Sequence, residues 1–323
     1  MTIASNISDP TPASIAKAAR LLREGKLVAF PTETVYGLGA DATSDAAVAA
    51  IFAAKGRPRF NPLIVHVENP AQAERIGVFE ARARELAKRF WPGALTLVVP
   101  RRAECGISWL ASAGLETIAL RCPAGVVAQN LLGAFGGPIA APSANRSGAI
   151  TSTTARHVVE SFGTLVELVL DGGRTQFGLE STIVGLTEPR PTLLRPGAIA
   201  REEIEVVIGA LGVASDCADA PHSPGRLKSH YAPVKRLRTN ATTVGADEAL
   251  LAFGKPLAGA KHMLNLSETG DLREAAANLF AMLRALDRGD ASAIAAMKVP
   301  RHGLGDAIND RLQRASTPKD HAL

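Results

Sequence analysis

The sequence predicts an α/β protein, with a twisted mixed sheet and flanking helices followed by a small Rossmann-like α/β domain. Two observations predict this fold. Helical and strand patterns alternate through the first part of the chain, as in sheets that are covered by helices. The periodicity is lost over 212–233, where Gly, Ser, Pro, Asp and His dominate, and then resumes. We therefore expect a first domain over 1–211, a linker over 212–233 and a second domain over 234–323.

The composition is that of an ordinary globular protein. A chain of 323 residues can form two domains, and its 46% hydrophobic and 21% charged residues exclude a disordered or fibrous protein. The net charge of +5 is compatible with ATP or tRNA as partners without requiring either. Cys105, Cys122 and Cys217 show no paired spacing, which argues against a disulfide framework or a zinc site. Without a signal-like start or a run of about 18 apolar residues, we expect a cytoplasmic protein.

Start and stop signals predict the helices of the first domain. Thr11 with Pro12 predicts the start of a helix whose apolar stripe stops at Gly25. Asp45 is expected to cap a helix over 46–54, which Gly56 would end. Further helical patterns cover 80–90, 126–135, 152–162 with Ser152 or Thr153 as the cap, and 202–211.

Short apolar runs between turn residues predict the strands. In the first domain they cover 27–30, 63–67, 95–99, 117–121, 139–141, 165–170, 181–186 and 192–194. In the second domain we expect strands near 235–238, 250–253 and 262–266, a long amphipathic helix over 272–288 and a last helix around 307–314.

Two stretches indicate a binding site. Pro31–Gly39 (PTETVYGLG) follows a predicted strand and is expected to form a binding loop, and the basic stretch Lys55–Arg59 (KGRPR) follows one helix later. Glycines let backbone amides approach an anion, threonines offer hydroxyl groups, and the basic stretch supplies cations. The pair therefore favours a site for a polyphosphate and a small polar substrate.

The glycines of the first stretch do not indicate a dinucleotide site. Gly37 and Gly39 match a variant of the dinucleotide fingerprint, but they lie far from the strand, and Arg57 and Arg59 stand where an acidic residue is expected. The sequence also has no Walker A motif, so dispersed side chains would have to hold a nucleotide. Paired cations and paired short donors fit such a role, although an exposed charged run or a polar turn has the same pattern.

Eight motifs, taken in order, resemble those of the YrdC-like family. They are PTETVYGLG (31–39), KGRP (55–58), NPLIVH (61–66), WPG (91–93), APSAN (141–145), DGG (171–173), ESTI (180–183) and LRPG (194–197). The segment SPGRLKSHYAP (223–233) resembles the linker of the two-domain members, which are L-threonylcarbamoyl-AMP (threonylcarbamoyladenylate) synthases. The resemblance covers the first domain and implies that it is a YrdC-like catalytic domain.

The resemblance implies a reaction. L-threonine, bicarbonate and ATP would give threonylcarbamoyl-AMP and pyrophosphate, for the N6-threonylcarbamoyladenosine (t6A) modification at adenosine 37 of tRNAs that read ANN codons. A downstream tRNA threonylcarbamoyl-transferase machinery would take the product, and Mg2+ would accompany ATP. Such a step needs alignment and charge neutralisation more than a covalent nucleophile, which suits a sequence without a catalytic triad.

The resemblance also implies roles for individual residues. The catalytic tetrad around the phosphates and the carbamate would be Lys55, Arg57, Ser143 and Asn145. ATP would contact Arg57, Asn61, Thr117, Ser143, Thr151, Arg195 and Tyr231, and L-threonine would contact Thr34, His66, Arg121, the Ala141 backbone and Ser181. No metal-binding side chains are expected, and the linker with Tyr231 would fold over the site to shield the labile carbamate from water.

Three alternatives remain at this point. The positive charge also fits a module that binds double-stranded RNA or tRNA, although 4% aromatic residues argue against base stacking. A maturation enzyme using carbamoyl phosphate would share the domain, but would carry zinc-finger and acylphosphatase modules that this sequence lacks. For His66, inside an apolar run, a hydrogen-bonded core histidine is the alternative to a ligand-binding residue.

Overall fold

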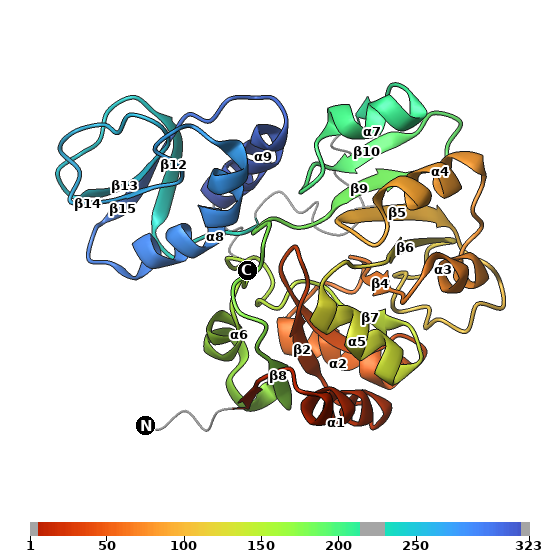
Figure 1. The fold of residues 1–323 in the computed structure, drawn as a ribbon. Helices are drawn as coiled ribbons and strands as arrows, with labels where there is room; N and C mark the ends of the chain where they lie inside the picture. The colour runs from red at the N-terminus through yellow and green to blue at the C-terminus, as the bar shows by residue number, and fades with distance from the viewer. Residues whose placement is uncertain (1–5, 214–229, 318–323) are drawn as a thin grey trace.

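The computed structural model describes residues 6–213 and 230–317. Figure 1 shows two α/β domains, a larger one with a mixed sheet and a smaller one, drawn in blue, with its own sheet. The predicted fold class is therefore confirmed. Residues 214–229, most of the predicted linker, lie outside the described residues. Within the described ranges, no helix is long and apolar enough to cross a membrane.

The large sheet has eleven strands in the order β1-β8-β2-β3-β7-β4-β6-β5-β9-β10-β11. Their bounds are β1 (Ile7–Ser8), β2 (Val28–Pro31), β3 (Tyr36–Asp41), β4 (Ile64–His66), β5 (Leu95–Pro100), β6 (Thr117–Arg121), β7 (Ile139–Ala140), β8 (Leu168–Leu170), β9 (Thr182–Gly185), β10 (Thr192–Arg195) and β11 (Gly212–Val213). Strand β2 is parallel to β8 and antiparallel to β3, so the sheet is mixed. The sequence did not predict β1 or β11, which are two residues long and carry no alternating pattern.

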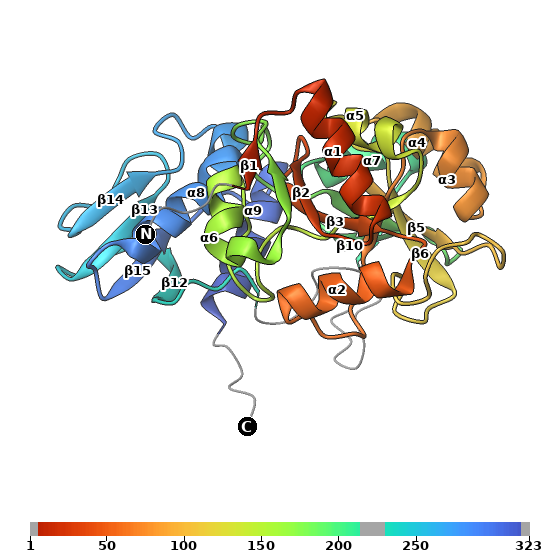
Figure 2. The same ribbon diagram turned by 90° about the horizontal axis from the view of Figure 1, so that it is seen from below.

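Helices cover both faces of this sheet (Figure 2). They are α1 (Pro12–Arg23), α2 (Asp45–Lys55), α3 (Pro70–Ile76), α4 (Ala81–Phe90), α5 (Val126–Phe135), α6 (Ala155–Phe162), the 3-10 helix η1 (Gly163–Leu165) and α7 (Arg201–Ile208). Side chains alternate across β2, so Phe30 packs in one cluster with α1 and α5, whereas Ala29 belongs to the main core with α2.

Two predicted helix caps are wrong by one or two residues. Thr11 caps α1 as expected, but Ser44 rather than Asp45 caps α2, because the Ser44 hydroxyl accepts a hydrogen bond from the Ala47 amide. Likewise Thr154, not Ser152 or Thr153, caps α6. Ser152 instead donates to the Ala144 carbonyl at 2.5 Å. A cap must directly precede the first helical turn, and neighbouring hydroxyl residues are hard to distinguish by sequence.

The stretch Pro31–Gly39 is a hairpin rather than a single loop. Strands β2 and β3 pair antiparallel, with Pro31 opposite Tyr36, so only residues 32–35 form the turn. The Thr32 hydroxyl closes this turn by accepting from the amides of Thr34 (3.2 Å) and Val35 (3.3 Å). The second half of the motif is therefore a buried strand, and its threonines lie at the turn.

The small domain has a four-stranded parallel sheet. Its order is β12 (Arg236–Ala241), β15 (Ala293–Met297), β13 (Glu248–Ala252) and β14 (His262–Asn265), with helices α8 (Leu272–Arg288) and α9 (Leu304–Ser316). Helix α8 has the predicted bounds. The sequence did not predict β15, whose alanine-rich sequence AIAAM has weak strand character.

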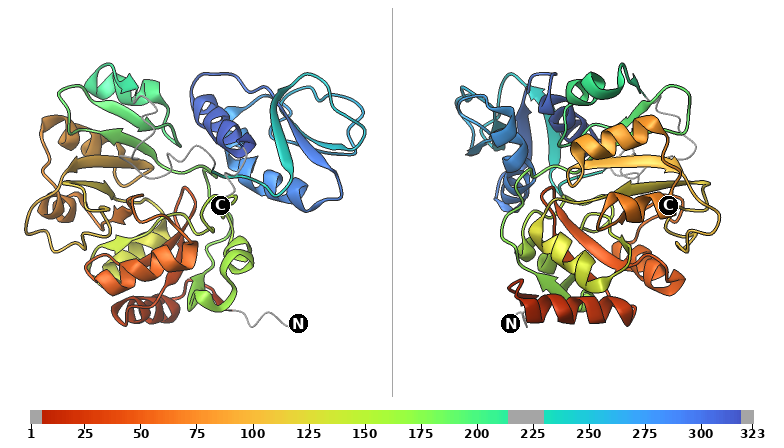
Figure 3. Two further views of the ribbon diagram at one scale, coloured as in Figure 1. Left: turned by 180° about the vertical axis from the view of Figure 1, so that it is seen from behind. Right: turned by 45° about the vertical axis from the view of Figure 1, so that its right-hand side comes forward.

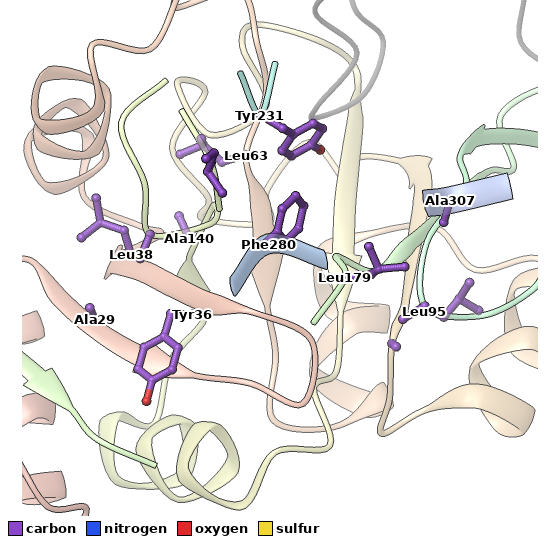
Figure 4. Packing of buried hydrophobic residues seen from close by; sticks show 14 of the residues in the cluster. Ala29, Tyr36, Leu38, Leu63, Leu95, Ala140, Leu179, Tyr231, Phe280 and Ala307 are labelled. Carbon is purple, nitrogen blue, oxygen red and sulfur yellow. The ribbon is translucent and has the colours of Figure 1, made fainter. Parts of the chain in front are cut away.

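The two domains pack against each other through α8 and α9 (Figure 3). Arg174 donates to the Ala277 carbonyl, and Arg284 donates to the Ile150 carbonyl, both at 2.7 Å. The apolar core is continuous across this junction: Figure 4 shows Tyr231 beside Phe280 of α8, with their ring centroids 5.3 Å apart. The small domain is therefore docked against Tyr231, near the end of the linker.

A glycine at the junction gives the first prediction. Gly178 has φ +64°, and a Cβ there would lie 2.5 Å from the Ala277 carbonyl oxygen of α8. We expect Gly178→Ala to lower the free energy of unfolding through both backbone strain and this clash. The clash alone should contribute about 1–3 kcal/mol. Gly173→Ala is the matched control, because Gly173 has φ +77° and no atom lies within 4 Å of the position that its Cβ would take. Urea unfolding that shows equal losses in both variants would contradict this tight approach of the domains.

Candidate functional site

A small cavity lies where the hairpin turn, β4, β6, the loop after β7 and the end of the linker meet. Its internal space is about 40 Å3. That volume holds about three water molecules, so the cavity as it stands is too small for a nucleotide. Nine of the residues predicted for the site line it: Thr34, Arg57, His66, Arg121, Ala141, Ser143, Ser181, Arg195 and Tyr231.

A buried ion pair organises one end of the cavity. Arg121 is 3% exposed, and its Nη2 donates to Glu33 Oε1 at 2.7 Å. The other oxygen of Glu33 accepts from the amides of Ala124 and Gly125, each at 3.1 Å, at the start of α5. Because Glu33 is fixed by backbone amides, it holds the Arg121 guanidinium in one orientation, which suits recognition of a carboxylate.

His66 lies beside this ion pair, since the register of β4 and β6 places it opposite Arg121. Burial, and then the charge of Arg121, lowers the pKa of His66 to about 3, so the imidazole is neutral. Its Nδ1 is buried and has no hydrogen-bond partner among the described residues. The alternative of a hydrogen-bonded core histidine therefore fits less well than a residue that bonds a ligand.

Two buried cations, Arg57 and Arg195, also line the cavity and define what we call its cationic end. Arg57 donates to Asn61 Oδ1 at 2.6 Å and to the Pro62 carbonyl at 2.7 Å, and Arg195 donates to the Ser181 carbonyl at 2.9 Å. Burial, and then the charge of Arg195, lowers the pKa of Arg57 to about 9. Burial also lowers the pKa of Arg195. Cations that are buried close together favour an anionic ligand, which would relieve their repulsion.

Two members of the predicted tetrad lie behind the cavity wall. Lys55 is buried and donates through Nζ to the Ser143 carbonyl at 2.6 Å and to the Asn145 carbonyl. Asn145 donates to the carbonyls of Arg146 and Ala149 at 2.9 and 2.8 Å. Burial, and then the charge of Arg57, lowers the pKa of Lys55 well below its ordinary value. In this structure Lys55 therefore orders the loop that presents Ser143 to the cavity.

The remaining predicted ATP contacts also lie outside the cavity lining. Asn61 accepts the hydrogen bond from Arg57, and Thr151 donates to Glu180 Oε1 at 2.9 Å. Thr117 is the first residue of β6 and shares a sheet face with Arg121, because side chains alternate along a strand. Thr117 and Arg121 therefore lie on the same face of β6, at opposite ends of the strand.

Three residues of the site were not predicted from the sequence. Glu33 and Glu180 each stand next to a predicted residue inside a recognised motif, which is the signal that could have found them. Glu180 is 5% exposed and lines the cavity. Arg311 of α9 donates from Nε to Glu180 Oε2 at 3.0 Å. No local signal identifies Arg311, because its pattern is that of any amphipathic helix.

Metal-binding side chains are not gathered at the site. Among residues 6–213 and 230–317, no group of three or more His, Cys, Asp or Glu side chains could hold a metal ion. The two carboxylates nearest the cavity, Glu33 and Glu180, are each bonded to an arginine.

Comparison with known proteins covers almost the whole chain. The Sua5/YciO/YrdC family model, described as "Telomere recombination", matches residues 20–197, and the model described as "Threonylcarbamoyl-AMP synthase, C-terminal domain" matches 199–317. A threonylcarbamoyl-AMP synthase of Pyrococcus abyssi is 41% identical over 98% of both chains, and one of Bacillus subtilis is 41% identical over 94% of this chain and 92% of its own. The crystal structure of P. abyssi Sua5 complexed with L-threonine is similar at 40% identity, with a TM-score of 0.89 and 96% of each chain covered.

The neutral His66 gives a pH prediction. With its pKa lowered to about 3 in the folded state, only the unfolded chain binds this proton between pH 3 and about 6.5. The free energy of unfolding should therefore fall as the pH drops below about 6.5, by up to about 1.4 kcal/mol per pH unit. His66→Gln should flatten this slope, whereas His302→Gln, at an exposed position, should leave it unchanged. Equal slopes for the wild type and His66→Gln in urea unfolding would disprove the buried neutral state.

Proposed function

This chain belongs to the Sua5/YciO/YrdC family and carries the threonylcarbamoyl-AMP synthase C-terminal domain, and on that premise we propose how its cavity carries out the reaction. The chain is a threonylcarbamoyl-AMP synthase. It joins L-threonine, bicarbonate and ATP into threonylcarbamoyl-AMP, releases pyrophosphate and serves t6A synthesis in tRNA. The observation that carries this conclusion is the similarity over nearly the full length of both domains. It favours an enzyme over the RNA-binding alternative.

L-threonine binds at the Arg121 end of the cavity in this proposal. The guanidinium, held by Glu33, pairs with the substrate carboxylate. The hydroxyl groups of Thr34 and Ser181, the Ala141 backbone and the neutral His66 line the same cavity and suit the hydroxyl and amine of threonine. The similar P. abyssi Sua5 crystallised as a complex with L-threonine, which supports threonine as a ligand of this chain.

ATP occupies the cationic end. We assign its contacts to Arg57, Asn61, Thr117, Ser143, Thr151, Arg195 and Tyr231, with Mg2+ held mainly by the phosphates. The buried cations support this assignment, since each gains a partner when a polyphosphate binds. The threonine amine first captures CO2, derived from bicarbonate, as a carbamate and loses a proton. A carbamate oxygen then attacks the α-phosphorus, and the bond to pyrophosphate breaks with its electron pair leaving on pyrophosphate.

The protein contributes alignment and charge to this step. In the proposal Arg57 and Ser143 face the reacting phosphate and carbamate. Lys55 and Asn145 act from behind the cavity wall, by ordering the loop that presents Ser143. Tyr231 and His230 close the cavity on the linker side. In the proposal these two residues move aside to admit ATP, and their return shields the carbamate from water. A tRNA threonylcarbamoyl-transferase machinery then consumes the adenylate.

The direct test is product formation. Purified protein with labelled bicarbonate, L-threonine, ATP and Mg2+ should give a labelled adenylate that depends on all three substrates. If the protein binds ATP but forms no labelled adenylate, the proposed function is wrong.

The cationic end gives a mutational prediction. Arg57→Ala should reduce adenylate formation by at least about 100-fold, because it removes a charge placed at the reacting phosphates, and Lys55→Ala should act in the same direction. The folded state should persist, as judged by circular dichroism. Arg59→Ala is the matched control, since Arg59 belongs to the same basic stretch but is exposed. Near-normal turnover of both Arg57→Ala and Lys55→Ala would contradict the assignment.

The threonine end gives a second prediction. Glu33→Gln removes the charge that fixes Arg121, so the KM for L-threonine should rise about tenfold, equivalent to about 1.4 kcal/mol, while the KM for ATP changes little. Steady-state kinetics with each substrate varied would measure this split. Glu68→Gln, at an exposed position just after β4, serves as the control. An unchanged KM for threonine in Glu33→Gln would show that the ion pair does not position the substrate.

A further inference from the structure

Arg311 reaches from the small domain to the wall of the cavity. It lies on α9 and is 1% exposed. Besides its bond to Glu180 Oε2, its Nη1 donates to the Pro196 carbonyl of the large domain at 2.9 Å and to Asp310 Oδ2 at 2.7 Å. Its Cζ lies 5.4 Å from the ring centroid of Tyr231. One side chain of the second domain thus contacts both a cavity-lining carboxylate and the residue that closes the cavity.

Glu180 needs such a partner if the cavity is to bind a polyphosphate. Its carboxylate lines the same space as Arg57 and Arg195, and a buried anion there would repel phosphate oxygens. An unpaired Glu180 could also turn towards these cations and neutralise the charge that phosphates require. With Oε1 bonded to Thr151 and Oε2 bonded to Arg311, the carboxylate is both neutralised and held in place.

The pKa shifts of Arg311 and Glu180 agree with this geometry. Burial alone would lower the pKa of Arg311, but Tyr231, Glu180 and Asp310 outweigh burial and raise the pKa above its ordinary value. Burial likewise raises the pKa of Glu180, but the charges of Arg311 and Arg195 outweigh it and leave the pKa below its ordinary value. Both partners are therefore charged, and the pair is a full ion pair across the domain junction.

We propose that the small domain completes the ATP site by supplying Arg311, a positioning residue that neutralises and fixes Glu180 from behind the cavity. ATP affinity then depends on the docking of the second domain, and threonine affinity does not. The threonine end has its own ion pair, Arg121 with Glu33, built entirely from the large domain. This inference rests on the proposed function in one respect, namely that the cavity binds ATP.

Two single variants and their double variant test the proposal. Their affinities for ATP are measured by calorimetry on the full-length chain. Arg311→Met should raise the Kd for ATP at least tenfold and the Kd for L-threonine less than twofold. Glu180→Gln, which keeps an acceptor for Thr151 but removes the negative charge, should bind ATP at least as tightly as the wild type. In the double variant, Glu180→Gln should restore most of the affinity lost in Arg311→Met. Rescue of this kind would not follow from a purely structural role for Arg311.

A control variant and a substitute variant accompany this test. Arg301→Met removes an exposed arginine of the same domain and should leave both affinities unchanged. If Arg311→Met does not fold, Arg311→Gln replaces it, since glutamine keeps a donor without the charge and should also weaken ATP binding at least tenfold. An ATP affinity equal to that of the wild type in a folded Arg311 variant overturns the proposal. So does a double variant that binds ATP no better than Arg311→Met.

The same measurements separate this inference from the proposed function. A wild-type protein that binds ATP but makes no adenylate refutes the reaction and leaves the comparison of variants interpretable. A wild-type protein that does not bind ATP refutes both.

Discussion

The pairing of buried charge is the constraint on which the site depends. Five basic side chains converge at or behind one cavity and are at most 8% exposed: Lys55, Arg57, Arg121, Arg195 and Arg311. Buried charges persist only where partners compensate them. Glu33 compensates Arg121 and Glu180 compensates Arg311, whereas Arg57 donates to amide and carbonyl oxygens. In our proposal the charge of Arg57 is therefore available to the phosphates of ATP.

The two compensating carboxylates, Glu33 and Glu180, come from different parts of the fold. Glu33 stands in the turn between β2 and β3 and is fixed by the amides of Ala124 and Gly125 just before α5, so the proposed threonine end is internal to the large domain. Glu180 precedes β9 and meets α9 of the small domain. In our proposal the two substrates bind at different ends of one cavity, and only the ATP end depends on the small domain. The second domain would then take part in ATP binding without contacting the reacting atoms.

Sequence reasoning succeeded where the signal is local. The period of α8 predicted its bounds, and hydroxyl and basic residues pointed to Thr34, Arg57 and Ser143 of the cavity lining. The other cavity-lining residues that were predicted came from the resemblance to the family. Sequence reasoning did not predict strand β3, because its glycine-rich sequence carries no strand pattern. Tyr36–Gly39 is nevertheless a buried part of this strand. Arg311 could not be found, because its partner Glu180 is 131 residues away and only tertiary packing joins them.

The most direct test of this account is the affinity for ATP of Arg57→Ala compared with that of the wild type. Arg57 is buried, lines the cavity and donates its hydrogen bonds to amide and carbonyl oxygens, so its charge is suited to phosphates. Calorimetric titration of the folded variant with ATP and with L-threonine measures both affinities. The account predicts that Arg57→Ala raises the Kd for ATP at least tenfold and changes the Kd for L-threonine little. An ATP affinity equal to that of the wild type would contradict the claim that phosphates complete the buried cationic site.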